Sequence, residues 1–181
     1  MQDYEPSKLR DVSVPLSEIA SKALPLAILL TVVPLIPHVL KWGYDSRFNA
    51  ADYLLGFVAV VLLLVAHEAT HAIGWIVFAG VQPKDIRFGI AWKTLSPYAH
   101  SKVAMKAGGY RVGVVLPLII TGIVPTVIGT LTNTGWLTVA GAILISGAVG
   151  DLIVLWVIRQ IPGEAMVIDH PQNAGCYVVD A

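Results

Sequence analysis

Four apolar stretches alternate with polar segments along the chain, and each is long enough, or nearly so, to cross a lipid bilayer. A helix needs about 20 residues to span the hydrocarbon. The first stretch contains Pro25, Pro34 and Pro37, which we expect to kink it or leave it shallow in the membrane. The second is longer than a bilayer requires, so its last turns should leave the hydrocarbon. The stretches cover roughly residues 23–40, 53–80, 112–131 and 136–158.

The polar segments between and around these stretches predict short extended elements. Within 81–111, the run "DIRFGIAW" places Ile86, Phe88 and Ile90 on one side, as in a half-buried strand. The tail, 159–181, holds two strand-like pieces around a Pro-Gln-Asn-Ala-Gly turn. The pattern therefore predicts an all-α integral membrane protein with about four transmembrane helices. It adds a short β-like segment between spans two and three and a short extended C-terminal tail. We expect one membrane-embedded domain over 1–181, with 1–22 as a polar N-terminal segment.

Composition agrees with a membrane protein and excludes some other classes. Only 13% of the 181 residues are charged, whereas soluble domains are near 25%, and 56% are hydrophobic. The formal net charge is zero, which gives no indication of a nucleic-acid partner. The single cysteine, Cys176, cannot form a disulfide within the chain. Residues 1–22 lack the features of a secretory signal, so we expect insertion without processing.

Basic residues predict the orientation of the four spans. With both termini in the cytoplasm, ten of the twelve Lys and Arg residues lie on the cytoplasmic side. Six of the ten lie between spans two and three, which makes 81–111 a cytoplasmic insert and 159–181 a cytoplasmic tail. These six residues are Lys84, Arg87, Lys93, Lys102, Lys106 and Arg111.

The second apolar stretch carries ionisable residues in the sequence "VAHEATHAIGW". On a helix, His67 and His71 lie on one face a turn apart, so each can offer a nitrogen to one zinc ion. Glu68 can then reach a water at the open coordination position. This is the HExxH arrangement, in which the glutamate serves as general base of a hydrolase. The alternative is a structural polar cluster, in which a buried carboxylate would have to be protonated or paired.

Zinc needs a third protein ligand, and depth in the membrane favours Asp151. Spans two and four run in the same direction in the predicted topology. Asp151 lies 15 residues past Trp136, and His67 lies 14 past Tyr53, which places both at one depth within about 2 Å. The other histidine within a span, His38, would lie at the opposite end of the bilayer. The alternatives for Asp151 are a proton-relay or pore residue, or a hydrogen bond to a neighbouring helix.

These residues resemble a known group of enzymes. The stretches "HEATHAIGW", "PYAHSK", "SGAVGDLIVLW" and "IDHPQNAGCYV" are similar to those of the intramembrane zinc proteases of the site-2 protease group. They are more similar still to a family of small bacterial and archaeal membrane proteins called putative zincin peptidases. Site-2 proteases usually carry a glycine after the aspartate, whereas here Gly150 precedes Asp151 and Leu152 follows it. The resemblance implies a metalloprotease in a prokaryotic cell membrane.

The expected function is a zinc-dependent intramembrane endopeptidase that cuts membrane-associated protein or peptide substrates. His67, His71 and Asp151 would hold zinc, and Glu68 would be the general base. His100, just beyond the membrane, is either a substrate or transition-state contact or a surface residue. Asp169 and His170 are expected to organise the turn before Pro171. The competing hypotheses are a membrane metal or ion transporter and a non-catalytic metal-binding membrane protein.

Overall fold

The computed structural model describes residues 8–15, 18–19, 23–43, 49–92 and 96–180. Its described part has four helices long and apolar enough to cross a membrane: Leu24–Trp42, Ala50–Ala79, Ala107–Leu131 and Gly135–Val157. These confirm the four predicted helices. The third helix begins five residues earlier than the apolar stretch, because the glycines and Tyr110 before Val112 are also helical.

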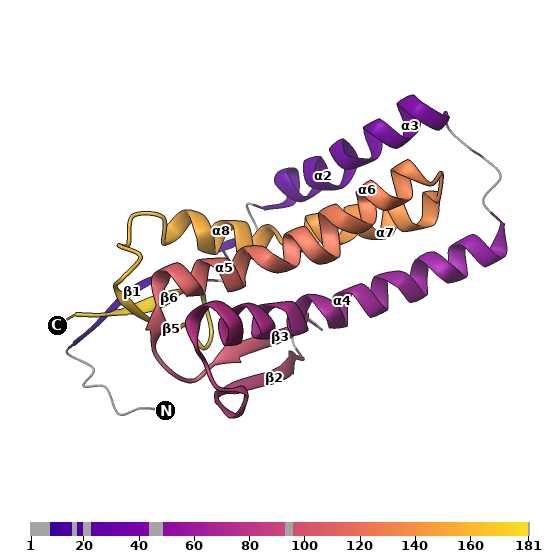
Figure 1. The fold of residues 1–181 in the computed structure, drawn as a ribbon. Coiled ribbons are helices and arrows are strands. Elements are labelled where there is room, and N and C mark those ends of the chain that lie inside the picture. Colours follow the sequence, from indigo (N-terminus) through magenta and orange to yellow (C-terminus); the bar gives the residue numbers. More distant parts are fainter. Residues whose placement is uncertain (1–7, 16–17, 20–22, 44–48, 93–95, 181) are drawn as a thin grey trace. The chain divides into compact units, whose positions relative to one another are not determined.

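Prolines and glycines divide the long helices into shorter elements, labelled in Figure 1. The first helix consists of α2 (Leu24–Val32), the 3-10 turn η2 (Val33–Leu35) and α3 (Ile36–Trp42), and the turn contains Pro34. The second is the unbroken α4 (Ala50–Ala79). It ends at Gly80, whose φ of 70° allows the amide of Val81 to bond back to the carbonyl of Trp75.

The third and fourth apolar helices each contain one irregularity. A π-helical segment, η4 (Leu118–Ile123), follows α5 (Ala107–Pro117) and precedes α6 (Val124–Leu131). Pro117 is the last residue of α5, and it has no amide hydrogen to donate to the helix. The fourth helix is interrupted at Ala148, between α7 (Gly135–Gly147) and α8 (Val149–Val157). Asp151 therefore lies in the first turn of a new helix.

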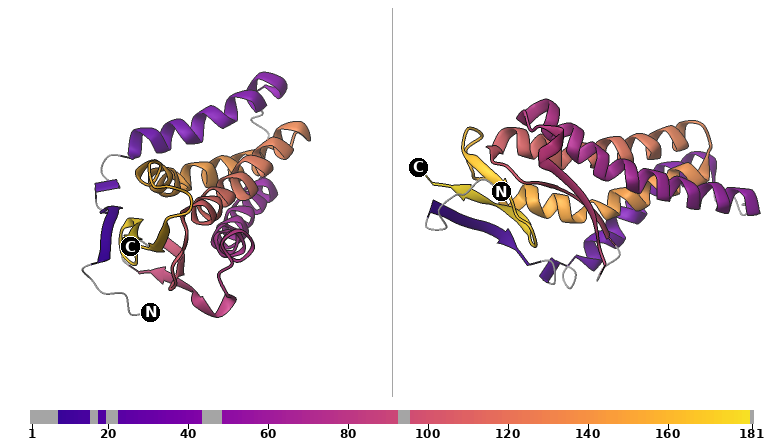
Figure 2. Two further views of the ribbon diagram at one scale, coloured as in Figure 1. Left: turned by 60° about the vertical axis from the view of Figure 1, so that its left-hand side comes forward. Right: turned by 90° about the horizontal axis from the view of Figure 1, so that it is seen from below.

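Strands from both ends of the chain and a two-residue strand from its middle form one sheet, which goes beyond the all-α expectation. Its order is β1 (Leu9–Val14), β6 (Ala174–Val179), β5 (Met166–Asp169) and β4 (Met105–Lys106). Figure 2 shows β1 and β6 side by side, and the two are antiparallel with Asp11 opposite Tyr177. The tail strands were expected, whereas β1 was not. Gly175 permits the close pairing, because a Cβ there would lie 2.2 Å from the carbonyl oxygen of Val12.

The predicted β-like segment between the second and third helices is an antiparallel hairpin. A 3-10 turn, η3 (Pro83–Asp85), leads into β2 (Ile86–Ala91), which pairs with β3 (Ser96–Ser101). Arg87 lies opposite His100 in this register, and Phe88 opposite Ala99. The hairpin confirms the strand predicted around Phe88 but not its buried face, since Phe88 and Ile90 are 57% and 49% exposed.

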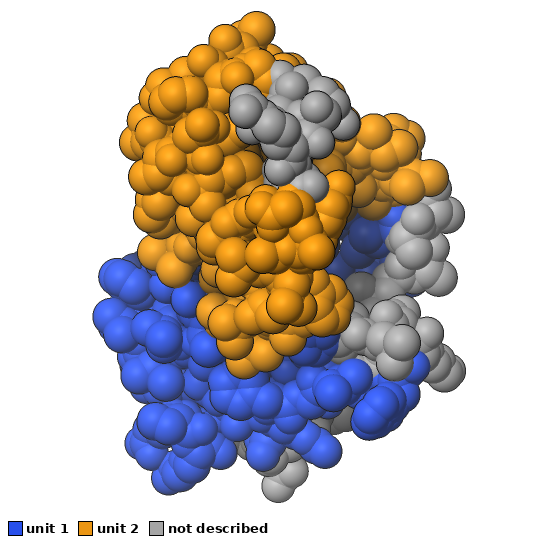
Figure 3. Space-filling view, turned by 90° about the vertical axis from the view of Figure 1, so that its right-hand side faces the viewer, with its two compact units in different colours: residues 1–22, 68–116, 150–181 blue, residues 23–67, 117–149 orange. Residues whose placement is uncertain are grey.

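The chain divides into two compact units, coloured separately in Figure 3: residues 1–22, 68–116 and 150–181 in the first, and 23–67 and 117–149 in the second. The first unit has a buried core that includes Trp75, Met105, Tyr110, Ile158 and Val167. In the second unit α7 packs against α2 and α6. There the hydroxyl of Ser146 donates to the carbonyl of Ala27 at 3.0 Å.

Candidate metal centre

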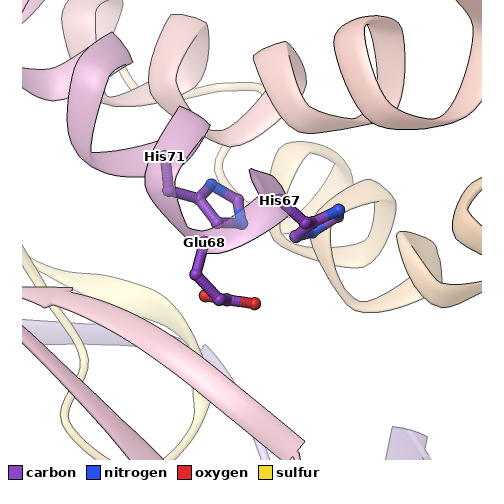
Figure 4. A group of neighbouring side chains, drawn as sticks. All are labelled: His67, Glu68 and His71. Carbon is purple, nitrogen blue, oxygen red and sulfur yellow. The ribbon is translucent and has the colours of Figure 1, made fainter. Parts of the chain in front are cut away.

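Three side chains of α4 come together as the HExxH spacing requires. His67 and His71 are buried, at 6% and 7% exposure, and Glu68 is half-buried. Each of the three offers a ligand atom, and these atoms lie within 4.8 Å of one another. Figure 4 shows the two rings a turn apart on the helix, with the carboxylate of Glu68 reaching from the turn between them. The group could therefore hold a metal ion.

A backbone carbonyl on α5 determines which nitrogen of His71 can bind a metal. The Nδ1 atom of His71 lies 2.9 Å from the carbonyl oxygen of Gly113. A carbonyl only accepts hydrogen bonds, so Nδ1 carries the hydrogen and Nε2 keeps its lone pair. The helices approach closely enough for this contact because glycines face each other there. A Cβ on Gly74 would lie 2.5 Å from the Cα of Gly113, and one on Gly113 would lie 2.2 Å from Trp75.

A threonine in the π-helical segment likewise determines which nitrogen of His67 can bind a metal. The Nδ1 atom of His67 lies 3.3 Å from the hydroxyl oxygen of Thr121, which is 1% exposed. That hydroxyl donates its one hydrogen to the carbonyl of Pro117 at 2.8 Å, so its oxygen accepts from His67. Both histidines thus carry the hydrogen on Nδ1 and the lone pair on Nε2, as is usual for metal-binding histidines whose other nitrogen is hydrogen-bonded.

Asp151 lies beside Nε2 of His71. Its Oδ1 atom is 3.5 Å from His71 Nε2, and the two side chains are 19% and 9% exposed. Two ligands at about 2.0–2.1 Å from one zinc ion, at tetrahedral angles, are about 3.3–3.4 Å apart. The observed separation therefore suits two ligands of one ion. The tight group consists of His67, Glu68 and His71, and Asp151 adjoins it through its contact with His71.

The other histidines named from the sequence lie elsewhere. His38 Nδ1 is 3.1 Å from the hydroxyl of Thr138. His170 organises the turn after β5, as expected, because its Nδ1 accepts from the amides of Gln172 and Asn173 at 3.1 and 2.8 Å. His100 lies on β3, and its Nδ1 is 2.7 Å from Oδ2 of Asp169.

Asp169 was expected to organise the turn before Pro171, but the structure gives its carboxylate other partners. It is the last residue of β5, and its two carboxylate oxygens bind His100 and Tyr110. These partners are 69 and 59 residues away in sequence. Nothing in the local sequence around Asp169 indicates them.

The donor set suits zinc. Two imidazole nitrogens at helical spacing, each with its second nitrogen hydrogen-bonded, and a carboxylate close to one of them match the ligand types of catalytic zinc sites. Nitrogen ligands argue against calcium and magnesium, which prefer sites built of oxygen ligands. The side chains and their hydrogen bonds therefore fit this metal.

Substitution of Thr121 by valine should weaken zinc binding about 10- to 100-fold, the usual cost of losing a partner of a ligand. Valine has nearly the same shape but cannot accept the hydrogen bond from His67. The measurement is a competition titration of the purified protein with a zinc chelator. Thr126→Val is the matched control, because Thr126 makes the same bond to the carbonyl four residues earlier, Gly122, at 2.8 Å. Equal zinc affinity in Thr121→Val and Thr126→Val would contradict the role assigned to Thr121.

Comparison with known proteins agrees with this chemistry. The sequence model of the family described as "Putative zincin peptidase" matches residues 60–166. The match covers more than half of the chain and includes the HExxH motif, His100 and Asp151, whereas Asp169 lies outside it. Searches of curated proteins and of solved structures gave no match. The chain belongs to the putative zincin peptidase family, and it is a zinc metallopeptidase by that membership.

Proposed function

We propose that the protein is an intramembrane endopeptidase in which His67, His71 and Asp151 bind zinc and Glu68 is the general base. The observation that carries the proposal is the position of HExxH inside α4, a 30-residue apolar helix. Ionisable groups are costly in such a segment and usually mark a functional site. A metal ion offsets the charge of Asp151, which makes its partial burial tolerable.

The proposed chemistry assigns a separate task to each side chain. Zinc supplies Lewis-acid polarisation of the scissile carbonyl and lowers the pKa of water. Glu68 takes a proton from the attacking water on its carboxylate and later gives it to the leaving amine. His71 and His67 would hold the ion through Nε2, because Gly113 and Thr121 accept the hydrogens on their Nδ1 atoms.

The proposed substrate is a membrane-associated protein segment, unwound where it is cut. A helical peptide bond is shielded by its own helix, so the substrate must present an extended stretch. The strands β2 and β3 pair only with each other among the described residues, and each has an outer edge. An extended substrate could add to the edge of β2 around Phe88 to Ala91. Main-chain pairing of this kind depends little on the substrate's sequence.

Purified protein is expected to hold about one zinc ion per chain, because it has one HExxH group. The measurement is metal content by mass spectrometry after purification in zinc-replete buffer. Protein that is folded but free of zinc under these conditions would overturn the proposed activity. Purification on a nickel affinity column should be avoided, because nickel that replaced zinc at the site would obscure the result.

We further propose that both termini and the β2–β3 hairpin face the cytoplasm. In Lys102→Cys and Gln172→Cys, both exposed positions, an impermeant thiol reagent should label inverted vesicles and not intact cells. Thr132→Cys, between the third and fourth spans, should give the opposite result. The native Cys176 is fully buried, and burial and the nearby Asp169 charge raise its pKa to about 12. The thiol of Cys176 should stay protonated and unlabelled at neutral pH. The wild-type protein therefore serves as the unlabelled control.

Labelling of Lys102→Cys from outside intact cells would reverse the proposed orientation. Because His67 lies toward the hairpin end of α4, reversal would also move the proposed metal site toward the external face. The zinc chemistry itself would be unaffected.

A further inference from the structure

A polar network away from the HExxH motif joins β3, α5 and the C-terminal strands. The Nδ1 atom of His100 and Oδ2 of Asp169 are 2.7 Å apart. The hydroxyl of Tyr110 donates to Oδ1 of Asp169 at 2.7 Å and also lies 3.1 Å from the carbonyl oxygen of Gly175. Tyr110 is 1% exposed, whereas the side chains of Asp169 and His100 are 13% and 21% exposed. Only the histidine end of the network reaches toward the surface.

The direction of these hydrogen bonds determines the state of the His100 ring. The carboxylate of Asp169 accepts from Tyr110 through one oxygen and from His100 through the other. Nδ1 of His100 therefore carries a hydrogen. In the neutral ring Nε2 then has a lone pair and can accept a hydrogen bond. Asp169 thus fixes which nitrogen of His100 is the acceptor.

The network packs against α4, the helix that carries His67 and His71. The ring of Tyr110 stacks on Trp75 with centroids 6.0 Å apart, and Trp75 stacks on His71 at 5.7 Å. One buried stack of rings therefore runs from His71, a proposed zinc ligand, to Tyr110, which holds the carboxylate that binds His100. In Figure 4 the carboxylate of Glu68 points to the side on which the strands coloured as the β2–β3 hairpin run. His100 belongs to that hairpin.

We propose that Asp169 is a positioning residue that keeps Nε2 of His100 as an acceptor for a main-chain N–H of the peptide substrate. The inference rests on the proposed endopeptidase activity and adds Asp169, at the end of β5, to the residues that prepare its substrate site. An extended peptide presents unpaired N–H groups, which are the donors such a nitrogen requires. A hydrogen bond made equally in substrate and transition state changes KM and leaves kcat nearly constant. Tyr110 acts through Asp169 by holding its carboxylate.

The first test measures the ring directly and needs no substrate. Protein labelled with ¹⁵N-histidine in detergent micelles should show His100 with the hydrogen on Nδ1, assigned by loss of its signals in His100→Gln. Asp169→Ala should remove this preference. Asp180→Ala is the matched control, because Asp180 is also near the end of the tail but pairs with Arg10 at 3.7 Å. A wild-type ring with its hydrogen on Nε2 would overturn the proposal.

The second test measures kinetics with fluorescently labelled casein, an unstructured protein, in the same micelles. His100→Ala and Asp169→Ala should each raise KM about 3- to 10-fold, as loss of one hydrogen bond would, with kcat within about twofold of wild type. The double variant should be no worse than His100→Ala, because Asp169 acts only through His100. Additive losses would show that Asp169 is merely structural. A fall in kcat at constant KM would make His100 a transition-state contact instead, and would overturn the acceptor role.

Tyr110→Phe keeps the inference testable where Asp169→Ala does not fold. Phenylalanine keeps the stack on Trp75 and removes only the hydroxyl that holds Asp169. KM should rise less than in His100→Ala, and this rise should vanish in the His100→Ala background. Failure of the proposed function gives a different result, because cleavage would then persist in Glu68→Gln or be absent from the wild type with both casein and a single-span protein.

Discussion

Replacing Glu68 by glutamine should reduce peptide hydrolysis by about 100- to 10,000-fold while zinc stays bound, the range attributed to general acid–base catalysis. Glutamine has nearly the same size but cannot take a proton from water. His67 and His71, with their partners Thr121 and Gly113, are untouched by the change. The measurement combines zinc content with cleavage of a co-reconstituted single-span membrane protein.

Two further variants separate loss of chemistry from loss of metal or fold. His67→Ala should also abolish cleavage, but with loss of zinc. Glu164→Gln should cleave at the wild-type rate, because this exposed carboxylate pairs with Lys106 at 2.7 Å and belongs to no ligand group. A transporter would instead show altered metal uptake in Glu68→Gln and no cleavage in any variant. Wild-type cleavage by zinc-loaded Glu68→Gln would remove Glu68 from the proposed mechanism.

Asp151→Asn should lower zinc affinity by more than about 100-fold, the upper end of what loss of a ligand's hydrogen-bonding partner costs. The amide keeps the shape of the carboxylate but supplies no negative charge to the ion. Two histidines alone would then hold the metal, one fewer than the three protein ligands usual for catalytic zinc. Chelator competition on wild type and variant gives the ratio of affinities.

Asp52→Asn is the matched control for Asp151→Asn. Asp52 is an aspartate in the first turn of α4, where its carboxylate accepts from the amide of Asn49 at 3.0 Å, outside the metal-binding group. Its substitution should leave zinc affinity unchanged. Equal affinity in Asp151→Asn and wild type would exclude Asp151 as a ligand. The 3.5 Å contact with His71 would then be an ion pair or hydrogen bond between helices.

The sequence by itself determined the apolar helices and the first part of the candidate site. The length of each apolar stretch predicts a helix that can cross a membrane, and the structure has all four within a few residues. His67, Glu68 and His71 lie together because the α-helical repeat brings residues four apart onto one face. Both results follow from properties of neighbouring residues, which a sequence displays directly.

The groups that hold the side chains of His67 and His71 in place are known only from the tertiary structure. The partners of His71 and His67 are a glycine carbonyl on α5 and a threonine in a π-helical segment. The spacing of Gly109 and Gly113 is a signal for close helix packing that could have indicated the first contact. The π-helical segment lies within a continuous apolar run, and its position there was not predicted.

In the sheet and in the His100 network, too, the sequence predicted the local element and the tertiary structure determined its partners. The extended tail was predicted, but its pairing with β1 joins residues at opposite ends of the chain. Asp169 was assigned to a turn because its neighbours His170 and Pro171 favour one, yet its carboxylate binds residues 59 and 69 positions away. Local periodicity carries no information about which distant segments meet. Those contacts arise only when burial of the core around Trp75 and Tyr110 brings the segments together, and that folding placed the partners of His100.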